Sequence, residues 1–149
     1  MKVATETVQT QDRWVKPAEF TLPAGLIGFP EARRIALLYN PEELPLMWLR
    51  SVDNPSLNFI VIDPVGTIPG YTLEISDEDA ETLGIRSPDE AIVLNIVTMK
   101  SSDPAEATVN LIGPIVINRE TLIGRQIIIA NFADYSARHP LLQTQPSES

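Results

Sequence analysis

The chain has 149 residues, 44% of them hydrophobic and 21% charged, a composition typical of a soluble globular domain. It contains no cysteine, which excludes disulfides, thiolate catalysis and cysteine-ligated zinc. Twenty acidic against eleven basic residues give a formal net charge of −9, which disfavours direct nucleic-acid binding because the chain would repel phosphates.

Short apolar runs separated by thirteen prolines and seven glycines predict an antiparallel β protein. The strands expected in the first half are residues 2–8, 20–22, 35–39, 47–52, 59–62 and 71–74. The polar residues 53–56 predict a hairpin between two of these strands. Trp48 lies in an apolar strand and is expected in the core, whereas Trp14 follows a polar segment and is expected near the surface.

A pair of glycines marks the segment Phe20-x-x-Pro23-x-Gly25-Leu26-x-Gly28-Phe29. Glycine adopts positive φ without steric cost, so this spacing predicts a tight turn that brings two large apolar rings together. Leu26, Ile27 and Phe29 then have two interpretations. They either close the end of the core or form an exposed patch that binds a partner.

An acidic segment follows in the middle of the chain. Ser76 is suited to cap a short helix over residues 76–84 that ends at Gly84. The acids clustered here are Glu74, Asp77, Glu78, Asp79, Glu81, Asp89 and Glu90. They indicate either a solvated helix surface or a docking face for a cationic partner, and the two interpretations are compatible.

The strands expected in the second half are residues 91–99, 107–112, 115–117 and 125–130. The run 92–97 is almost continuously apolar, which indicates a strand covered on both faces or one lining a barrel. The expected fold is therefore mostly β: a small antiparallel β-barrel or strongly curved sheet with one or two short helices. We expect one domain over residues 1–142 and a disordered polar tail at residues 143–149.

Patterns for catalysis are weak in this sequence. His139 and Ser136 are close in sequence, but no nucleophile elbow is present, and Tyr135 is expected to pack its ring and hydrogen-bond its hydroxyl. The sequence Asp77-x-Asp79-x-Glu81 lacks the glycine and terminal glutamate of a calcium loop. We therefore expect no enzyme activity, no metal and no cofactor. No apolar run approaches the roughly 20 residues that span a bilayer.

Several motifs, in order, resemble the FliW family of flagellar assembly factors. They are the glycine segment above, Trp48-Leu49-x-Ser51-Val52-Asp53-x-Pro55, Ile62-Asp63-Pro64, Pro114-Ile115-Val116-Ile117-Asn118, and Asp134-Tyr135-Ser136-x-Arg138-His139-Pro140-Leu141-Leu142. The resemblance runs from about Met1 to Leu142. It implies a cytoplasmic regulator that binds flagellin and antagonises the translational repressor CsrA.

The charge pattern suggests a hypothesis for the CsrA-facing surface, namely Glu74, Asp77, Glu78, Asp79 and Glu81. Leu26 and Phe29 are the further candidates for partner contacts. We expect a monomer when free, with no membrane and no direct nucleic-acid partner. The alternative is a small oligonucleotide-binding β-barrel, which the net charge and the 6% aromatic content disfavour.

Overall fold

The computed structural model describes residues 1–4 and 18–141. The strands are β1 (Lys2–Ala4), β2 (Ala18–Thr21), β3 (Arg34–Leu38), β4 (Met47–Ser51), β5 (Asn58–Ile62), β6 (Thr72–Glu74), β7 (Ala91–Thr98), β8 (Thr108–Val109), β9 (Ile115–Asn118), β10 (Gly124–Gln126) and β11 (His139–Pro140). The helices are α1 (Asp77–Leu83) and the short 3-10 turns η3 (Pro41–Glu43), η4 (Pro88–Glu90), η5 (Pro104–Glu106) and η6 (Phe132–Asp134). The mostly β prediction is confirmed.

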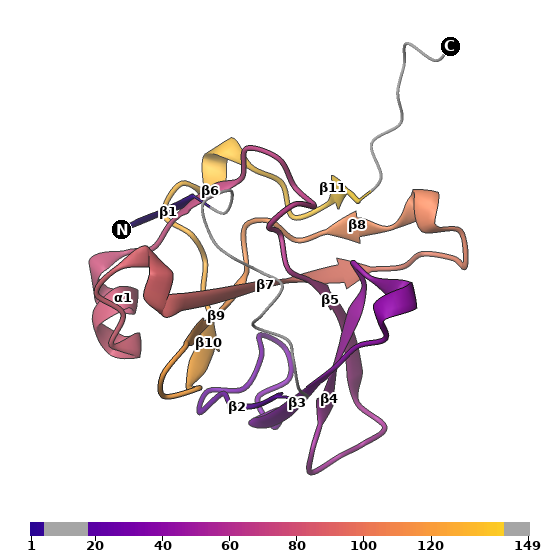
Figure 1. The fold of residues 1–149 in the computed structure, drawn as a ribbon, viewed down its shortest axis with the longest axis horizontal. Helices are drawn as coiled ribbons and strands as arrows, with labels where there is room; N and C mark the ends of the chain where they lie inside the picture. The colour runs from indigo at the N-terminus through magenta and orange to yellow at the C-terminus, as the bar shows by residue number, and fades with distance from the viewer. Residues whose placement is uncertain (5–17, 142–149) are drawn as a thin grey trace.

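Nine strands form one sheet, whose main path runs β10-β9-β7-β5-β4-β3-β2. β8 pairs with the end of β7, β11 pairs with β8, and β1 and β6 form a separate antiparallel pair. Figure 1 shows β7 running across the molecule between α1 and the β8 hairpin. The sheet does not close into a barrel. Its two edge strands approach each other at a single parallel bridge between Thr21 and Ile123, so the strongly curved sheet is the form adopted.

The apolar run in β7 is explained by two cores that lie on its opposite faces. Val93 and Val97 point into a core with Ile62 and Val116, while Ile92 and Leu94 point into a second core between the two arms of the curved sheet. Successive side chains of a strand point to opposite faces. Because both faces of β7 are covered, both sets of alternate positions are buried, and the sequence lacks the alternation of apolar and polar residues that a half-exposed strand shows.

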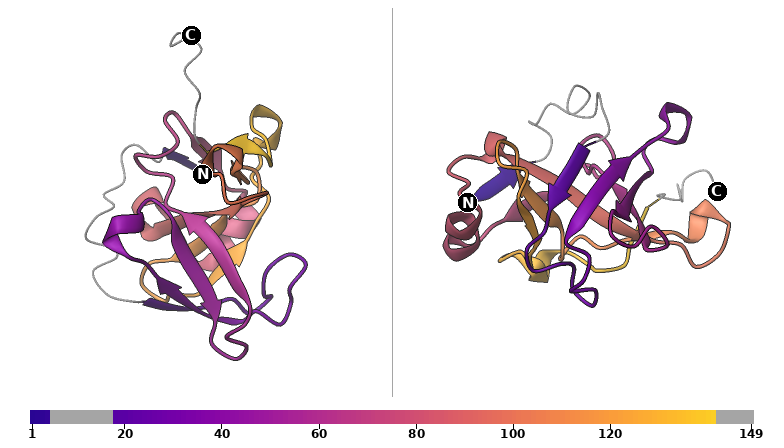
Figure 2. Two further views of the ribbon diagram at one scale, coloured as in Figure 1. Left: turned by 90° about the vertical axis from the view of Figure 1, so that its right-hand side faces the viewer. Right: turned by 90° about the horizontal axis from the view of Figure 1, so that it is seen from below.

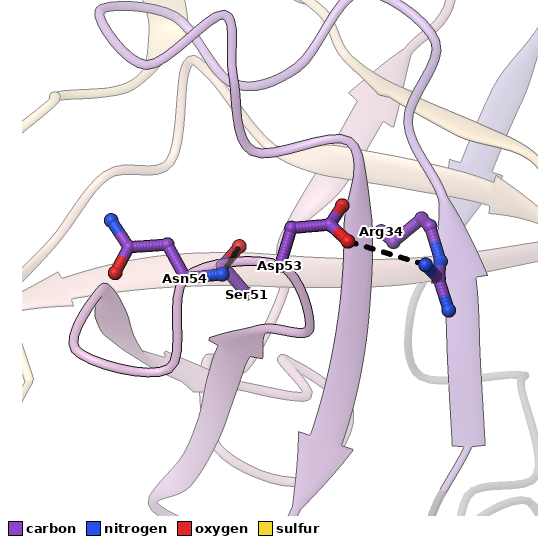
Figure 3. Close-up of polar contacts among 4 residues, drawn as sticks. All are labelled: Arg34, Ser51, Asp53 and Asn54. Atoms are coloured by element: carbon purple, nitrogen blue, oxygen red, sulfur yellow. Dashed lines mark hydrogen bonds and ion pairs between the residues drawn. The ribbon is translucent and has the colours of Figure 1, made fainter.

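The predicted hairpin is formed by β4 and β5, with Met47 opposite Val61 and Arg50 opposite Asn58. Its turn is fixed by side chains: the buried Ser51 Oγ accepts a hydrogen bond from Asn54 N at 3.1 Å. Arg34 from β3 forms an ion pair with Asp53 at 3.2 Å (Figure 3). This arrangement accounts for the Ser51-Val52-Asp53 motif, because the serine and the aspartate have separate structural roles.

Some predicted features differ in the structure. Trp48 is half-buried beside Leu38 and Tyr39 on the outer surface of the sheet, because its neighbours Met47 and Leu49 take the inward positions of β4. β11 was not expected, since two residues carry no periodicity. Trp14 and residues 143–149 lie outside the described residues. In residues 1–4 and 18–141, no helix has the length and apolarity that a membrane crossing requires.

Candidate functional site

The two glycines build a tight turn at the end of β2. Leu26 N donates to Phe29 O at 3.0 Å and Phe29 N donates to Leu26 O at 2.8 Å, with Gly28 at φ +87° between them. A Cβ on Gly25 would lie 2.5 Å from Pro30 O, so only glycine fits this position. In the left view of Figure 2 the loop that follows β2 projects from the end of the sheet.

The ring that contacts Phe29 comes from a distant strand. Phe29 and Phe59 of β5 meet edge to face, with ring centroids 5.1 Å apart. The sequence predicted that the turn brings together the two phenylalanines that frame it, Phe20 and Phe29, but the ring that Phe29 contacts is Phe59. Leu26 is buried, whereas Ile27 is 60% exposed and Phe29 is 39% exposed. The turn is therefore divided: Leu26 closes the core and the other two residues are displayed, and partner binding by the displayed pair stays a prediction.

An apolar groove of about 370 Å³ lies beside this turn, at the open end of the second core. Its lining residues are uncharged: Leu26, Ile27, Phe29, Phe59, Ile96, Asn110, Ile112, Gly113, Gln126 and Ile128. Ile128 is 50% exposed on its rim. Contiguous exposed apolar surface of this kind marks an interaction site more often than isolated apolar residues do.

Gln126 links the two sides of the apolar groove. Its Oε1 accepts a hydrogen bond from Ile27 N at 2.9 Å, and its Nε2 donates to Gly113 O at 2.9 Å. The turn is thus attached to β10 by a side chain, although residues 27 and 126 are 99 positions apart. This bond holds the turn in place without covering the groove.

The predicted acidic residues gather around α1. Asp77, Glu78 and Glu81 are exposed on the helix, while Glu74 and Asp79 are half-buried. Asp79 forms an ion pair with Arg125 at 3.9 Å, and Lys2 lies opposite Glu74 in the β1–β6 ladder. We call these five residues the acidic face. Its three exposed carboxylates have no ion pair in the described part of the chain.

The helix that carries these acids is short and strongly capped. Ser76 Oγ accepts from Asp79 N at 3.1 Å, and Gly84 ends the helix at φ +71°, as the sequence predicted. Acids in the first turn also favour the positive end of the helix dipole. Farther along the chain, the Ser87 hydroxyl donates to Asp89 and lowers the pKa of that carboxyl.

Asn131 and Tyr135, the second from the C-terminal motif, hydrogen-bond to the edge of β6. Asn131 donates to Thr72 O at 2.9 Å and accepts from Glu74 N at 2.8 Å, and Tyr135 Oη accepts from Thr72 N at 2.9 Å. The Tyr135 ring packs edge to face on Tyr71 at 5.0 Å. Its predicted structural role, ring packing with a bonded hydroxyl, is confirmed.

The residues considered for catalysis are used structurally. Ser136 Oγ accepts from Arg138 N at 2.9 Å, and His139 belongs to β11, opposite Val109. Asp77, Asp79 and Glu81 lie on an α-helix and not in a loop, and the described residues contain no group of acids or histidines arranged to hold a metal ion.

Sequence analysis missed most of the apolar groove. It identified Leu26 and Phe29, but Phe59, Ile96 and Ile128 come from three other strands or their extensions. Each of these residues taken alone has the signature of an ordinary strand residue. The fold and these two surfaces define a class: a small β-rich scaffold that displays an uncharged groove and a separate acidic helix on its surface.

Comparison with known proteins gives the family. A family model described as FliW protein matches residues 2–141. The chain is 46% identical over 124 residues to the flagellar assembly factor FliW of Geotalea uraniireducens, covering 83% of this chain and 74% of that protein. It is 38% identical over 128 residues to the factor of Leptospira interrogans, covering 86% and 85%.

A solved structure agrees with these matches. The crystal structure of the flagellar assembly factor FliW superposes with a TM-score of 0.73 at 29% identity, covering 96% of this chain and 98% of that chain. This chain therefore belongs to the FliW family of flagellar assembly factors.

Proposed function

We propose that this protein acts in the cytoplasm as a partner-switching regulator that binds CsrA and flagellin. Bound to CsrA, it prevents repression of target messenger RNAs, including that of flagellin. Bound to flagellin, it acts as a chaperone and leaves CsrA free to repress. Such a circuit works by competition of affinities for one pool of protein and requires no cofactor or chemical step.

The observation that carries the proposal is the set of exposed carboxylates on the acidic face of a FliW-family chain. Asp77, Glu78 and Glu81 are exposed on one short helix and form no ion pair with a described residue. A basic RNA-binding protein would be steered toward this face. Once it is docked, the negative field would also weaken its hold on RNA phosphates.

The apolar groove suits the other partner. A filament subunit that has not yet assembled exposes apolar surface, which it later buries against its neighbours. An uncharged groove lined by Phe29, Phe59 and Ile96 would cover part of such a surface and so prevent premature association. We assign flagellin to the apolar groove and CsrA to the acidic face.

The experiment that tests this proposal is size-exclusion chromatography of the purified protein with CsrA, with flagellin or with a labelled flagellin messenger leader, at moderate salt. We expect co-elution with each protein and none with the RNA. When this protein is titrated into a mixture of CsrA and the RNA, it should release the RNA from CsrA. Co-elution with RNA alone would favour the oligonucleotide-binding alternative, and failure to bind either protein at micromolar concentration would refute the proposal.

A further inference from the structure

β10 and the chain that follows it, residues 127–129, have an outer edge that is joined to other elements at both ends. At the first end, Ile123 forms the isolated bridge with Thr21 of β2, and Thr21 N donates to Leu122 O at 2.9 Å. At the far end, Ala130 N donates to Glu74 O of β6 at 2.7 Å. The backbone between these two points runs past the apolar groove.

Within that stretch, alternate residues face in opposite directions. Ile127 N donates to Pro114 O and Ile129 N donates to Ile112 O, so both residues face the β9 side. In an antiparallel pair the residues between them direct their N–H and C=O groups the other way. Gln126 and Ile128 therefore present two backbone donors and two acceptors outward. We call these groups the open edge, and no described residue hydrogen-bonds to them.

The open edge and the apolar groove are contiguous. Gln126 and Ile128 both line the groove, so a strand laid along the open edge would direct alternate side chains toward Phe29 and Phe59. The lining carries no charged side chain, and a charged group entering it would lose hydration without compensation. The complementary segment is thus extended in backbone and uncharged in the side chains that enter.

From this geometry we infer that the partner bound at the apolar groove contributes an extended, uncharged, apolar segment that adds to the open edge as a β-strand. The inference deepens the proposed function and rests on it, since it takes the occupant to be a segment of flagellin. A helix in the groove would satisfy its own backbone and leave all four groups of Gln126 and Ile128 unused.

A second copy of this chain fits less well. The open edge spans only two outward residues, and β2 and β6 of the same chain flank it on either side. A folded domain would have to bring its own edge strand between these flanking elements. A flexible segment can enter that space singly, and its backbone then supplies the complementary hydrogen bonds.

The test compares two substitutions at one position with purified flagellin monomer as the probe. Ile128→Ala removes the side chain and keeps the outward N–H. Ile128→Pro removes that N–H as well and places a ring where the added strand would approach. The bonds from Ile127 N to Pro114 O and from Ile129 N to Ile112 O remain, so an edge position tolerates the proline. We expect Ile128→Pro to bind flagellin at least about tenfold more weakly than Ile128→Ala by calorimetry.

A second measurement does not depend on any variant. In the wild-type protein, we expect flagellin to slow hydrogen exchange at the Gln126 and Ile128 amides, measured by NMR, because strand addition buries and bonds both. Two results would overturn the inference while leaving flagellin binding intact. One is that the two variants bind flagellin equally well and have equal midpoints of thermal unfolding. The other is that exchange at these two amides is the same in the complex as in the free protein.

The remaining outcomes are also decisive. Slow exchange at both amides in the free protein would mean that the chain covers its own open edge, and exchange that slows with protein concentration would mean that a second copy does. Either result overturns the inference. Absence of any binding between wild-type protein and flagellin would instead refute the proposed function, so the two failures can be told apart.

Discussion

Asn118 of β9 donates from its side-chain amide to Leu83 O at 2.8 Å and so attaches the end of the acidic helix to the main sheet. Its Oδ1 also accepts from Glu120 N at 2.9 Å and from Thr121 N at 3.2 Å. One buried side chain thus positions both α1 and the turn that leads into β10. The acidic face on α1 and the strand β10 beside the apolar groove are therefore both held by Asn118.

Replacing Asn118 should therefore destabilise the fold. Asn118→Ala leaves Leu83 O and two backbone N–H groups without their partner, and we expect the free energy of unfolding to fall by about 2–3 kcal/mol. Urea denaturation at neutral pH measures the change. Asn54→Ala, in the exposed β4–β5 turn, serves as the control and should cost about 0.5 kcal/mol or less. Equal effects would refute the supporting role of Asn118.

The two glycines of the turn should differ in their tolerance of alanine. Both have positive φ, which costs an alanine about 1–2 kcal/mol. A Cβ at Gly28 meets no atom within 4 Å, whereas at Gly25 it would overlap the backbone of Pro30. We expect Gly25→Ala to lower stability by at least about 1 kcal/mol more than Gly28→Ala, measured by thermal and urea unfolding. A smaller difference in stability between the two variants would contradict the close approach of Gly25 to the Pro30 backbone.

Tyr71 predicts an alkaline limit to stability. Burial raises the pKa of its hydroxyl, which donates to Leu111 O at 2.5 Å and accepts from Asn95 Nδ2 at 3.3 Å. The folded pKa lies above the unfolded value of about 10, so the stabilisation is complete below pH 10 and is lost as pH rises above it.

Tyr71→Phe should change this dependence. We expect the variant to be about 1–2 kcal/mol less stable at neutral pH, because it loses the hydroxyl's hydrogen bonds. Its stability should then fall less steeply between about pH 9 and pH 11 than that of the wild type. Urea titrations across this range give the two slopes, and identical slopes would contradict the prediction.

The acidic face can be tested with matched charge changes. Asp77→Asn, Glu78→Gln and Glu81→Gln together remove three exposed carboxylates from α1. Glu42→Gln, Glu43→Gln and Glu106→Gln remove three exposed carboxylates elsewhere and change the net charge equally. We expect the first set to slow association with CsrA about threefold to tenfold at low salt and to flatten its salt dependence.

The control set should leave most of that association rate and its salt dependence in place. Stopped-flow mixing at several salt concentrations provides the comparison. If both triple variants slow association to the same degree, total charge and not the acidic face would be responsible. An unchanged salt slope in the first variant would remove the acidic face from the CsrA interaction.

Local patterns predicted much of the fold. Ser76 and Gly84 predicted the ends of α1, because capping depends on neighbouring backbone groups alone. The turn at residues 53–56 predicted the β4–β5 hairpin for the same reason. Trp48 was misplaced because its strand is apolar at successive positions, and composition alone does not tell which alternate set points inward.

Local sequence patterns are enough to specify the β-rich class, the capped helix, the clustering of acids around it and the tight glycine turn. Each of these follows from residues within one or two turns of chain, where propensity, capping and spacing act directly. Three other features depend on the tertiary structure: the sheet stays open, Phe29 contacts Phe59, and Gln126 reaches Ile27 beside a strand edge to which no described residue hydrogen-bonds. These features join residues far apart in the chain, and they depend on how strongly the sheet curves, which is set by the packing of both cores together.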